Sequence, residues 1–363
     1  MKVKWLRGKD QFLFTRPETW FALGIRGSGK SSHLEHIGLH YLQQDCVILD
    51  LFGSRDGEGL AWLRSPEAKD KKILLVKGDG CDVDSCFPVK HCDALKLEDF
   101  EKFDVIVSAS PLYRNIGEEF FYAAKITDLL YQRLHYKRLI YMICREAANL
   151  YYSRLKVNDN QLFAKSQMIY MIREARHIGV ALGCDSVRFY AIDIDVRSLS
   201  DYLLIKNQGM QGLPKDLKFL YSYVEPHLFR QMNPDEYIVL TDKGSIGYGY
   251  FPEVSWHKRE RENILDSVGV DVNFGDAPLK RGKYRGTYNT VGDSEHCEII
   301  RLYVDEGLNM HQVAATLKGG RSTGTVLGHI HKHNDSVRRS EFCPTCKRAN
   351  SPFAEKLAQR NKK

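Results

Sequence analysis

The sequence predicts an α/β fold with a mostly parallel sheet, followed by a small all-helical domain and a basic tail. Three observations lead to this prediction. Short, fully apolar runs alternate with longer amphipathic segments over the first two thirds of the 363 residues. One of these runs leads directly into a glycine-rich loop that opens a helical pattern. After Trp256 the composition becomes charged and polar, and helical spacing returns only near residue 293.

The apolar runs indicate strands that are buried on both faces, because such strands have no solvent-facing side. We expect strands at 20–24, 46–50, 73–76, 105–107, 139–144, 180–182 and 189–192, and helices at 118–135 and 161–177. Residues 237–251 indicate a strand–turn–strand hairpin. The expected organisation is a core over 1–256, a linker over 257–292, a helical domain over 293–338, and a tail over 339–363.

Composition limits the class of protein. Hydrophobic residues make up 43% and charged residues 27%, the balance of a globular protein that buries a sizeable core. The net charge of +7 leans towards the C-terminus, where residues 318–363 hold eleven Lys or Arg against three Asp or Glu. Neither a signal peptide nor an apolar membrane span is visible. The nine irregularly spaced cysteines do not indicate a disulfide framework, so we expect an intracellular, cytoplasmic protein.

The glycine-rich loop has the complete spacing G-x-x-x-x-G-K-S, from Gly24 to Ser31. Its glycines let backbone N–H groups surround phosphates, and the following helix adds its positive N-terminal end. Lys30 is expected to reach the terminal phosphates and Ser31 to ligate magnesium. The sequence therefore predicts a site for ATP with Mg²⁺. Its expected residues are Gly24, Gly27, Ser28, Gly29, Lys30, Ser31, Ser32 and Asp50.

Hydrolysis also needs a carboxylate at the end of a neighbouring strand. The best candidate is Glu146, which follows the apolar run 139–144 and would polarise the attacking water. Arg145 stands where an aspartate that orients magnesium is usual. Either Asp50 or Glu58 supplies the missing acid, or Arg145 marks a site that binds ATP and hydrolyses it slowly. An acid at a helix N-terminus is the plainer interpretation of Glu146.

These motifs, followed by the run Ile172 to Val180, resemble the HerA–FtsK superfamily of phosphate-loop ATPases over roughly residues 18–256. The resemblance implies a RecA-like core, assembly into a homo-oligomeric ring, and ATP-driven movement of double-stranded DNA. The sequence departs from the family at two places. Arg145 stands where an aspartate is usual, and Asp185-Ser186 stands where a polar Gln is usual. A ring ATPase also needs a basic finger that reaches the neighbour's site. The candidate is Arg197, with Arg173, Arg176 and Arg188 as rivals.

The helical pattern from 293 to 338 resembles a helix-turn-helix. Helices are expected over 297–304 and 310–317, with a third that starts at Ser322. In that geometry the third helix enters the major groove of DNA. The residues expected to face DNA are Ser322, Thr323, Thr325, His329 and Lys332. A small protein-binding helical domain is the alternative.

Cys343-Pro344-Thr345-Cys346 forms a CxxC knuckle, which is half of a zinc site. His329, His331, His333 or the same knuckle of another subunit would supply the other half. A second, looser group has a spacing unlike the common zinc fingers. Its members are Cys81, Cys86, His91 and Cys92.

The sequence as a whole favours an ATP-hydrolysing translocase or packaging-type motor on double-stranded DNA. The first alternative is an ATP-binding regulatory switch whose helix-turn-helix binds DNA. The second alternative is a non-enzymatic, zinc-bearing adaptor that recruits a partner to DNA.

Overall fold

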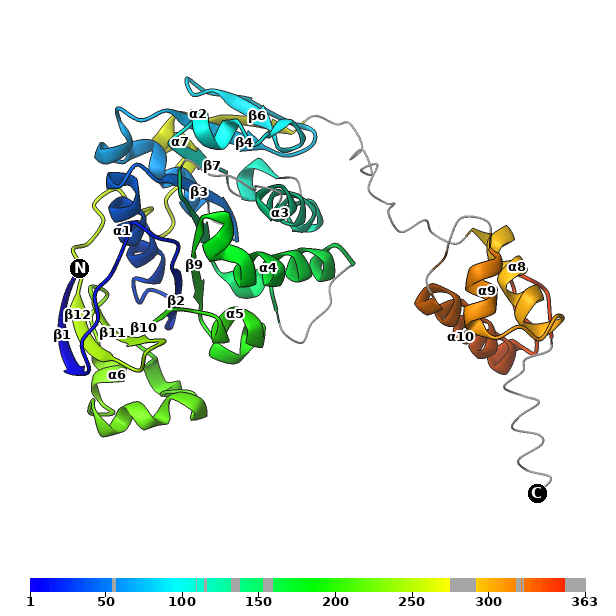
Figure 1. Cartoon of the computed structure of the whole chain (residues 1–363). Coiled ribbons are helices and arrows are strands. Elements are labelled where there is room, and N and C mark those ends of the chain that lie inside the picture. Colours follow the sequence, from blue (N-terminus) through cyan, green and yellow to red (C-terminus); the bar gives the residue numbers. More distant parts are fainter. Residues whose placement is uncertain are drawn as a thin grey trace. The chain divides into compact units, whose positions relative to one another are not determined.

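The computed structural model describes residues 1–53, 57–108, 110–113, 116–131, 138–152, 159–274, 292–317, 321 and 323–349. The chain divides into a larger unit, Met1–Leu279, and a smaller unit, Lys280–Lys363 (Figure 1). Within the described ranges, every helix is too short or too polar to cross a membrane.

One large sheet organises the larger unit. Its described strands follow the order β1-β12-β11-β10-β2-β9-β8-β3-β7-β4-β6. The run from β10 to β6 is parallel throughout, whereas β11, β12 and β1 add an antiparallel edge. The strands are β1 (Lys2–Arg7), β2 (Thr19–Leu23), β3 (Val47–Phe52), β4 (Ile73–Lys77), β6 (Val89–His91), β7 (Val105–Val107), β8 (Ile140–Cys144), β9 (Val180–Ser186), β10 (Tyr202–Ile205), β11 (Glu236–Thr241) and β12 (Ile246–Tyr250).

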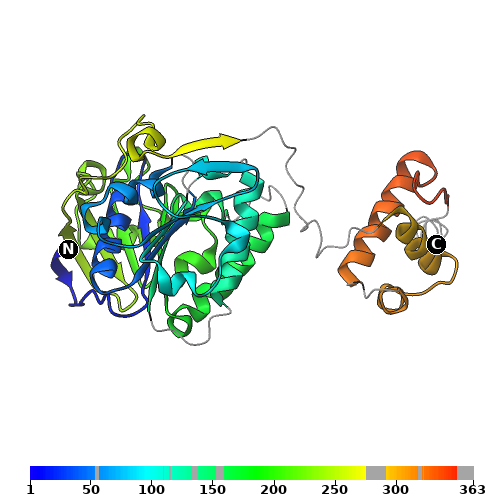
Figure 2. The same ribbon diagram turned by 90° about the horizontal axis from the view of Figure 1, so that it is seen from above.

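Helices cover both faces of this sheet (Figure 2). Alternate residues of β2 show the two layers, because successive side chains of a strand point to opposite faces. Trp20 packs in one apolar cluster with Leu34 of α1, whereas Phe21 packs in another with Phe120 of α3 and Met168 of α4. The helices of this unit are α1 (Lys30–Gln43), α2 (Asp99–Lys102), α3 (Ile116–Tyr131), α4 (Asp159–Ile178), α5 (Ile194–Ser198), α6 (Leu228–Gln231) and α7 (Ile264–Val268).

The predicted α/β class and mostly parallel sheet are confirmed. The strand expected at 189–192 is wrong, since Phe189–Ala191 forms a 3₁₀ turn. Here Ser186 Oγ accepts from the N–H of Arg188 at 3.2 Å and donates to the Arg188 carbonyl at 2.9 Å. This local pairing turns the chain at the end of β9, although the residues that follow are apolar.

The first part of the expected linker, residues 257–274, lies in the larger unit instead. Arg64 Nη2 donates to the His257 carbonyl at 2.9 Å. The helix α7 contacts the 3₁₀ segment Glu58–Arg64, and β13 (Asp271–Phe274) pairs antiparallel with β5 (Cys81–Asp84). Charged composition suggested a linker because it does not reveal a partner distant in sequence. Residues 275–291 lie outside the described ranges.

The smaller unit contains α8 (Asp293–Val304), α9 (Met310–Thr316) and α10 (Thr323–Ser340), close to the three helices expected. Its core includes Ile299 of α8, Val313 of α9, and Val326 and Ile330 of α10. The side chain of Asn309 accepts from the N–H groups of residues 311 and 312 and so fixes the start of α9.

Two buried histidines of α1 should make the larger unit sensitive to acid. His33 stacks on Phe251, with ring centroids 4.1 Å apart. Burial lowers the pKa of His33 well below its usual value and that of His36 to about 4. Between pH 7.5 and 5.0 these histidines gain protons in the unfolded chain but not in the folded one. We expect the free energy of unfolding to fall by roughly 1–2 kcal/mol per histidine over this range.

Urea unfolding at the two pH values measures this difference. The double variant His33→Gln/His36→Gln should show a smaller loss, and His227→Gln, at an exposed histidine, should behave like the parent. Equal stability of the parent at both pH values would contradict the prediction.

Candidate nucleotide site

The phosphate loop joins β2 to α1, as the sequence predicts. Gly27 and Gly29 have φ angles of 72° and 77°, in the left-handed region that favours glycine. A Cβ on Gly29 would lie 2.4 Å from the Pro234 carbonyl oxygen, so a larger residue does not fit. No side chain caps the N-terminus of α1. Its first N–H groups therefore point towards the loop and suit an anion.

The polar side chains of the loop fit a polyphosphate. Lys30 is 7% exposed, and its Nζ donates to the Ile25 carbonyl at 3.0 Å. Ser28 Oγ donates to the same carbonyl at 2.8 Å. Ser32 Oγ is buried without a hydrogen-bond partner among the described residues. A buried hydroxyl in this state is ready to bind a ligand oxygen.

Arg145 is fully buried and binds three carboxylates. Its Nη2 donates to Asp50 Oδ2 at 2.6 Å and to Glu35 Oε1 at 2.8 Å, and its Nη1 to Glu58 Oε2 at 3.2 Å. Arg145, Glu35 and Asp50 are at most 1% exposed. His257 extends this network, with Nδ1 2.7 Å from Glu35 Oε2. We call these five side chains the arginine network.

The network engages Asp50, which the sequence offered as the acid of the nucleotide site. Arg145 Nε and Nη2 bind both of its oxygens, and Trp62 Nε1 donates to Oδ2 at 3.0 Å. Burial raises the pKa of Asp50, and the charge of Arg145 opposes that rise. Glu58, the other acid considered, contacts both Arg145 and the Ser31 hydroxyl. Glu58 is therefore the member of the arginine network that also contacts the phosphate loop.

Asp185 lies beside the phosphate loop, which the sequence does not indicate. It stands where a polar Gln is usual in the resembling family, and its Oδ2 accepts from Ser31 Oγ at 3.2 Å. Its Oδ1 accepts from the backbone N–H of Glu146. Burial raises its pKa to about 6, and the charge of Lys30 opposes that rise. One sequence feature could have pointed to Asp185: it is a carboxylate near the end of an apolar strand. The sequence does not show, however, that this strand, β9, lies beside β2.

Glu146 lies at the carboxyl end of β8, where the parallel strands meet the phosphate loop. Its φ of 41° is left-handed, which is unusual for a residue with a side chain. The side chain is exposed, and its Oε2 accepts from Asn149 Nδ2 at 3.0 Å. Such strained backbone is typical of functional sites. Through Asp185, Glu146 is tied to Ser31.

Arg197, the expected finger, stacks on two aromatic rings. Its guanidinium carbon lies 4.7 Å from the ring centre of Phe189 and 5.1 Å from that of Tyr190. It also pairs with Asp216 at 3.9 Å. These contacts hold Arg197 beside the loop after β9, and its action on a neighbouring subunit stays a prediction. Arg176, another candidate for the finger, has a side chain that the structure does not describe.

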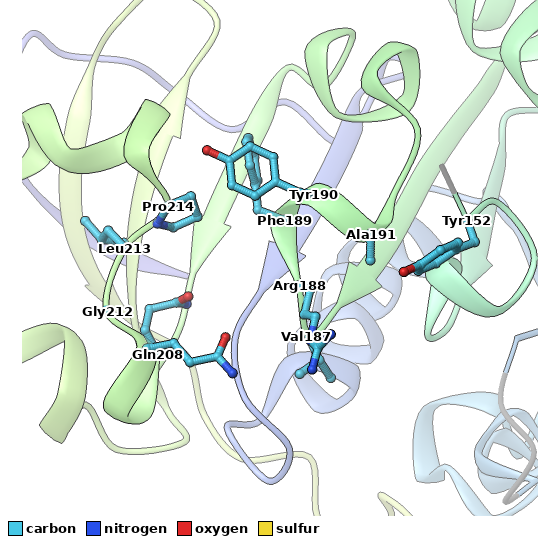
Figure 3. A pocket seen from close by; sticks show the side chains of 11 residues that line it. Tyr152, Val187, Arg188, Phe189, Tyr190, Ala191, Gln208, Gly212, Leu213 and Pro214 are labelled. Carbon is cyan, nitrogen blue, oxygen red and sulfur yellow. The ribbon is translucent and has the colours of Figure 1, made fainter. Parts of the chain in front are cut away.

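A pocket of about 340 Å³ is lined by residues of the loops after β9 and β10 and by Tyr152, which follows β8. Figure 3 shows Tyr152 and Gln208 on opposite sides with Arg188 between them. The loop after β10 is tied to the end of β2, because Gln208 Nε2 donates to the Leu23 carbonyl at 3.1 Å. Aromatic, amide and guanidinium groups are suited to bind a heterocyclic base.

The expected DNA-facing residues divide into two groups. Lys332 is exposed on α10, and Thr323 and Thr325 are half-buried near its start. His329 instead contacts His296 of α8, with the two Nδ1 atoms 3.0 Å apart. Ser322 and the tail beyond residue 349 lie outside the described part of the chain.

The two cysteine groups also differ. Cys346 Sγ lies 3.3 Å from His333 Nδ1, as one of the predicted pairings requires. The looser group does not assemble. Among the described side chains, His91 gathers with Asp79 and Asp93 and not with cysteine.

No protein-family model matches the chain, and no curated protein matches it. Solved structures that resemble it include the genome packaging NTPase B204 from Sulfolobus turreted icosahedral virus 2 in complex with AMP. The identity is 15% and the TM-score 0.38, over 65% of this chain and 98% of that chain. The pCW3 conjugation coupling protein TcpA gives 14% and 0.40, over 69% of this chain and 65% of that chain.

The cytoplasmic domain of the Thermomonospora curvata type VII secretion ATPase EccC gives 11% identity and a TM-score of 0.38. The likeness covers 68% of this chain and 24% of that chain. At these identities and scores, the likenesses assign neither an activity nor a partner to this chain.

Removal of Arg145 should destabilise the larger unit strongly. Arg145→Met keeps much of the volume but leaves Asp50 and Glu35 buried without the guanidinium that binds them. We expect a loss of roughly 3–5 kcal/mol in the free energy of unfolding, measured with urea. The control is Lys243→Met, which breaks the ion pair of a 59% exposed lysine with Asp10. That change should cost less than about 1 kcal/mol. If Arg145→Met lowers the free energy of unfolding no more than the control does, the arginine network does not stabilise the fold.

Proposed function

We propose that this chain is an ATP-hydrolysing translocase or packaging-type motor that acts on double-stranded DNA. The observation that carries the proposal is the double contact of Asp185, which binds the Ser31 hydroxyl and the N–H of Glu146. It brings the phosphate loop and an exposed carboxylate to one edge of the sheet. Phosphoryl transfer to water needs these two features together.

The side chains fit separate roles in this reaction. Lys30 and the first turn of α1 would bind the phosphates. Ser31 would hold Mg²⁺, and Asp185 and Glu58, which contact the Ser31 hydroxyl, would accept hydrogen bonds from water ligands of the ion. When bound, the ion would neutralise charge on the phosphates. Glu146 would orient and polarise the attacking water. The pocket lined by Tyr152, Gln208 and Arg188 would take the nucleoside.

Support for DNA as the partner comes from the resemblance of residues 18–256 to the HerA–FtsK superfamily and from the basic C-terminal segment. The helix α10 carries Lys332, exposed, and ends with Arg338 and Arg339. Basic residues on one helix of a small helical unit favour a nucleic acid over a neutral partner. The motor would work as a homo-oligomeric ring in which Arg197 acts on the neighbouring site.

The second candidate is a regulatory switch that binds ATP, hydrolyses it slowly and binds DNA through the smaller unit. One observation favours it: the Glu146 carboxylate is hydrogen-bonded to Asn149, which restrains the proposed base. Turnover distinguishes the two candidates, because a motor must hydrolyse ATP faster on DNA.

The steady-state rate of ATP hydrolysis tests the motor. We expect long double-stranded DNA to raise the rate severalfold, and Lys30→Ala, as the blank, to abolish it. Glu146→Gln should lower the rate by roughly 10²–10³-fold while ATP still binds, since it removes only the polarising carboxylate. Asp185→Asn keeps an acceptor for the Glu146 N–H but loses charge near Ser31, so it should raise the Mg²⁺ concentration needed. Tight ATP binding with a negligible rate that DNA does not change would exclude the motor and leave the switch.

The affinity for double-stranded DNA tests the role of α10. Lys332→Glu should weaken binding by about tenfold at low salt and make the affinity less dependent on salt. Arg301→Glu on α8 changes the net charge equally and should have a smaller effect, because Arg301 is already paired with Glu306. Fluorescence anisotropy at two salt concentrations measures both. An equal loss in the two variants would indicate a general effect of charge rather than an interface on α10.

A further inference from the structure

Four potential metal ligands converge in the smaller unit. They are His296 on α8, His333 on α10, and Cys343 and Cys346 in the turn that follows α10. One ligand atom from each lies within 4.8 Å of the others. Cys343 Sγ is 3.5 Å from His296 Nε2, and Cys346 Sγ is 3.3 Å from His333 Nδ1.

These separations fit tetrahedral zinc. With Zn–S near 2.3 Å and Zn–N near 2.0–2.1 Å, sulfur and nitrogen ligands of a tetrahedral ion lie roughly 3.5 Å apart. The two observed sulfur–nitrogen distances agree with that value. His296, His333 and Cys343 are at most 3% exposed, so the ligand atoms face one another inside the unit.

The turn between the cysteines is built to present both sulfurs. The Cys343 N–H donates to the Arg348 carbonyl at 2.9 Å, and the Lys347 N–H donates to the Cys343 carbonyl at 2.8 Å. Lys347 has a left-handed φ of 58°, which allows the chain to reverse. The side chains therefore point to one side of a closed loop, towards the two histidines.

A further contact would orient one ligand. With Nε2 of His296 facing Cys343, its Nδ1 lies 3.0 Å from Nδ1 of His329. Metal-bound histidines usually donate their other ring N–H to a partner, which fixes the ring. Here His296 would donate to His329. This assigns His329 a role other than the DNA contact expected from its place in the sequence.

We propose that the smaller unit binds one structural Zn²⁺ through His296, His333, Cys343 and Cys346. Four protein ligands of this kind close the coordination sphere, so the site is structural and not catalytic. The ion would fasten the segment after α10 to both α8 and α10. A unit whose described core is this small gains much of its stability from such a link. The proposal is independent of ATP hydrolysis.

The zinc content of the full-length chain tests the proposal. The chain would be purified from zinc-supplemented medium, dialysed against metal-free buffer without chelator, and analysed by elemental mass spectrometry. We expect one zinc per chain in the parent and in two control variants, Cys86→Ser and His331→Asn. Cys86 and His331 are both exposed and outside the cluster. The double variant Cys343→Ser/Cys346→Ser should hold less than a tenth as much zinc, and His296→Asn should lower the affinity at least tenfold.

Cobalt titration provides a second measurement that does not depend on the folding of a variant. The parent chain, stripped of zinc, should develop the visible absorption of tetrahedral, thiolate-bound Co²⁺, which an equimolar amount of Zn²⁺ abolishes. Hydrogen exchange of residues 293–340 should become faster after chelation and slow again when Zn²⁺ is restored. A parent chain without zinc, or equal zinc in the double cysteine variant, would overturn the proposal whatever the ATPase rate.

Discussion

The buried Arg145 is the interaction on which the arrangement of the larger unit depends. It binds carboxylates from α1, β3 and the 3₁₀ segment after β3, so one cation joins three parts of the chain at the carboxyl edge of the sheet. Buried carboxylates without this cation would be strongly unfavourable. Because Arg145 directly follows β8, its buried contacts also hold the next residue, Glu146, at this edge of the sheet. Arg145 thus stands where an acid of the nucleotide site is usual, and it holds together the segments around that site.

The acid next to the phosphate loop comes from a neighbouring strand. Asp185 lies near the carboxyl end of β9, which lies between β2 and β8, and it contacts residues that follow both of those strands. This position explains how the site retains a carboxylate beside Ser31 although Asp50 is bound to Arg145. The left-handed backbone of Glu146 occurs together with the bond from its N–H to Asp185.

The sequence predicted those features that depend on neighbouring residues. The phosphate loop, the apolar strands and the three helices of the smaller unit all follow from local spacing. Contacts that depend on the order of strands could not be predicted from the sequence. Ser31 and Asp185 are 154 positions apart and meet only because β9 pairs with β2. The contact of His296 with Cys343 could not be predicted for the same reason, since 47 positions separate the two residues. The strand predicted at 189–192 is wrong because a short apolar segment is compatible with a turn that packs on the sheet as well as with a strand.

The orientation of Arg145 changes the weight of the two functional alternatives. From the sequence, Arg145 suggests a site that binds ATP and hydrolyses it slowly, because it stands where an aspartate that orients magnesium is usual. In the fold the Arg145 guanidinium forms ion pairs with Asp50, Glu35 and Glu58. Of these three carboxylates, only Glu58 also contacts Ser31. The arginine therefore gives no reason for slow turnover. For the proposed base, Glu146, the bond from Asn149 engages one carboxylate oxygen, and a carboxylate can accept more than one hydrogen bond. A single hydrogen bond between exposed or half-buried groups is worth roughly 0.5–1.5 kcal/mol, which is too little to block the reaction.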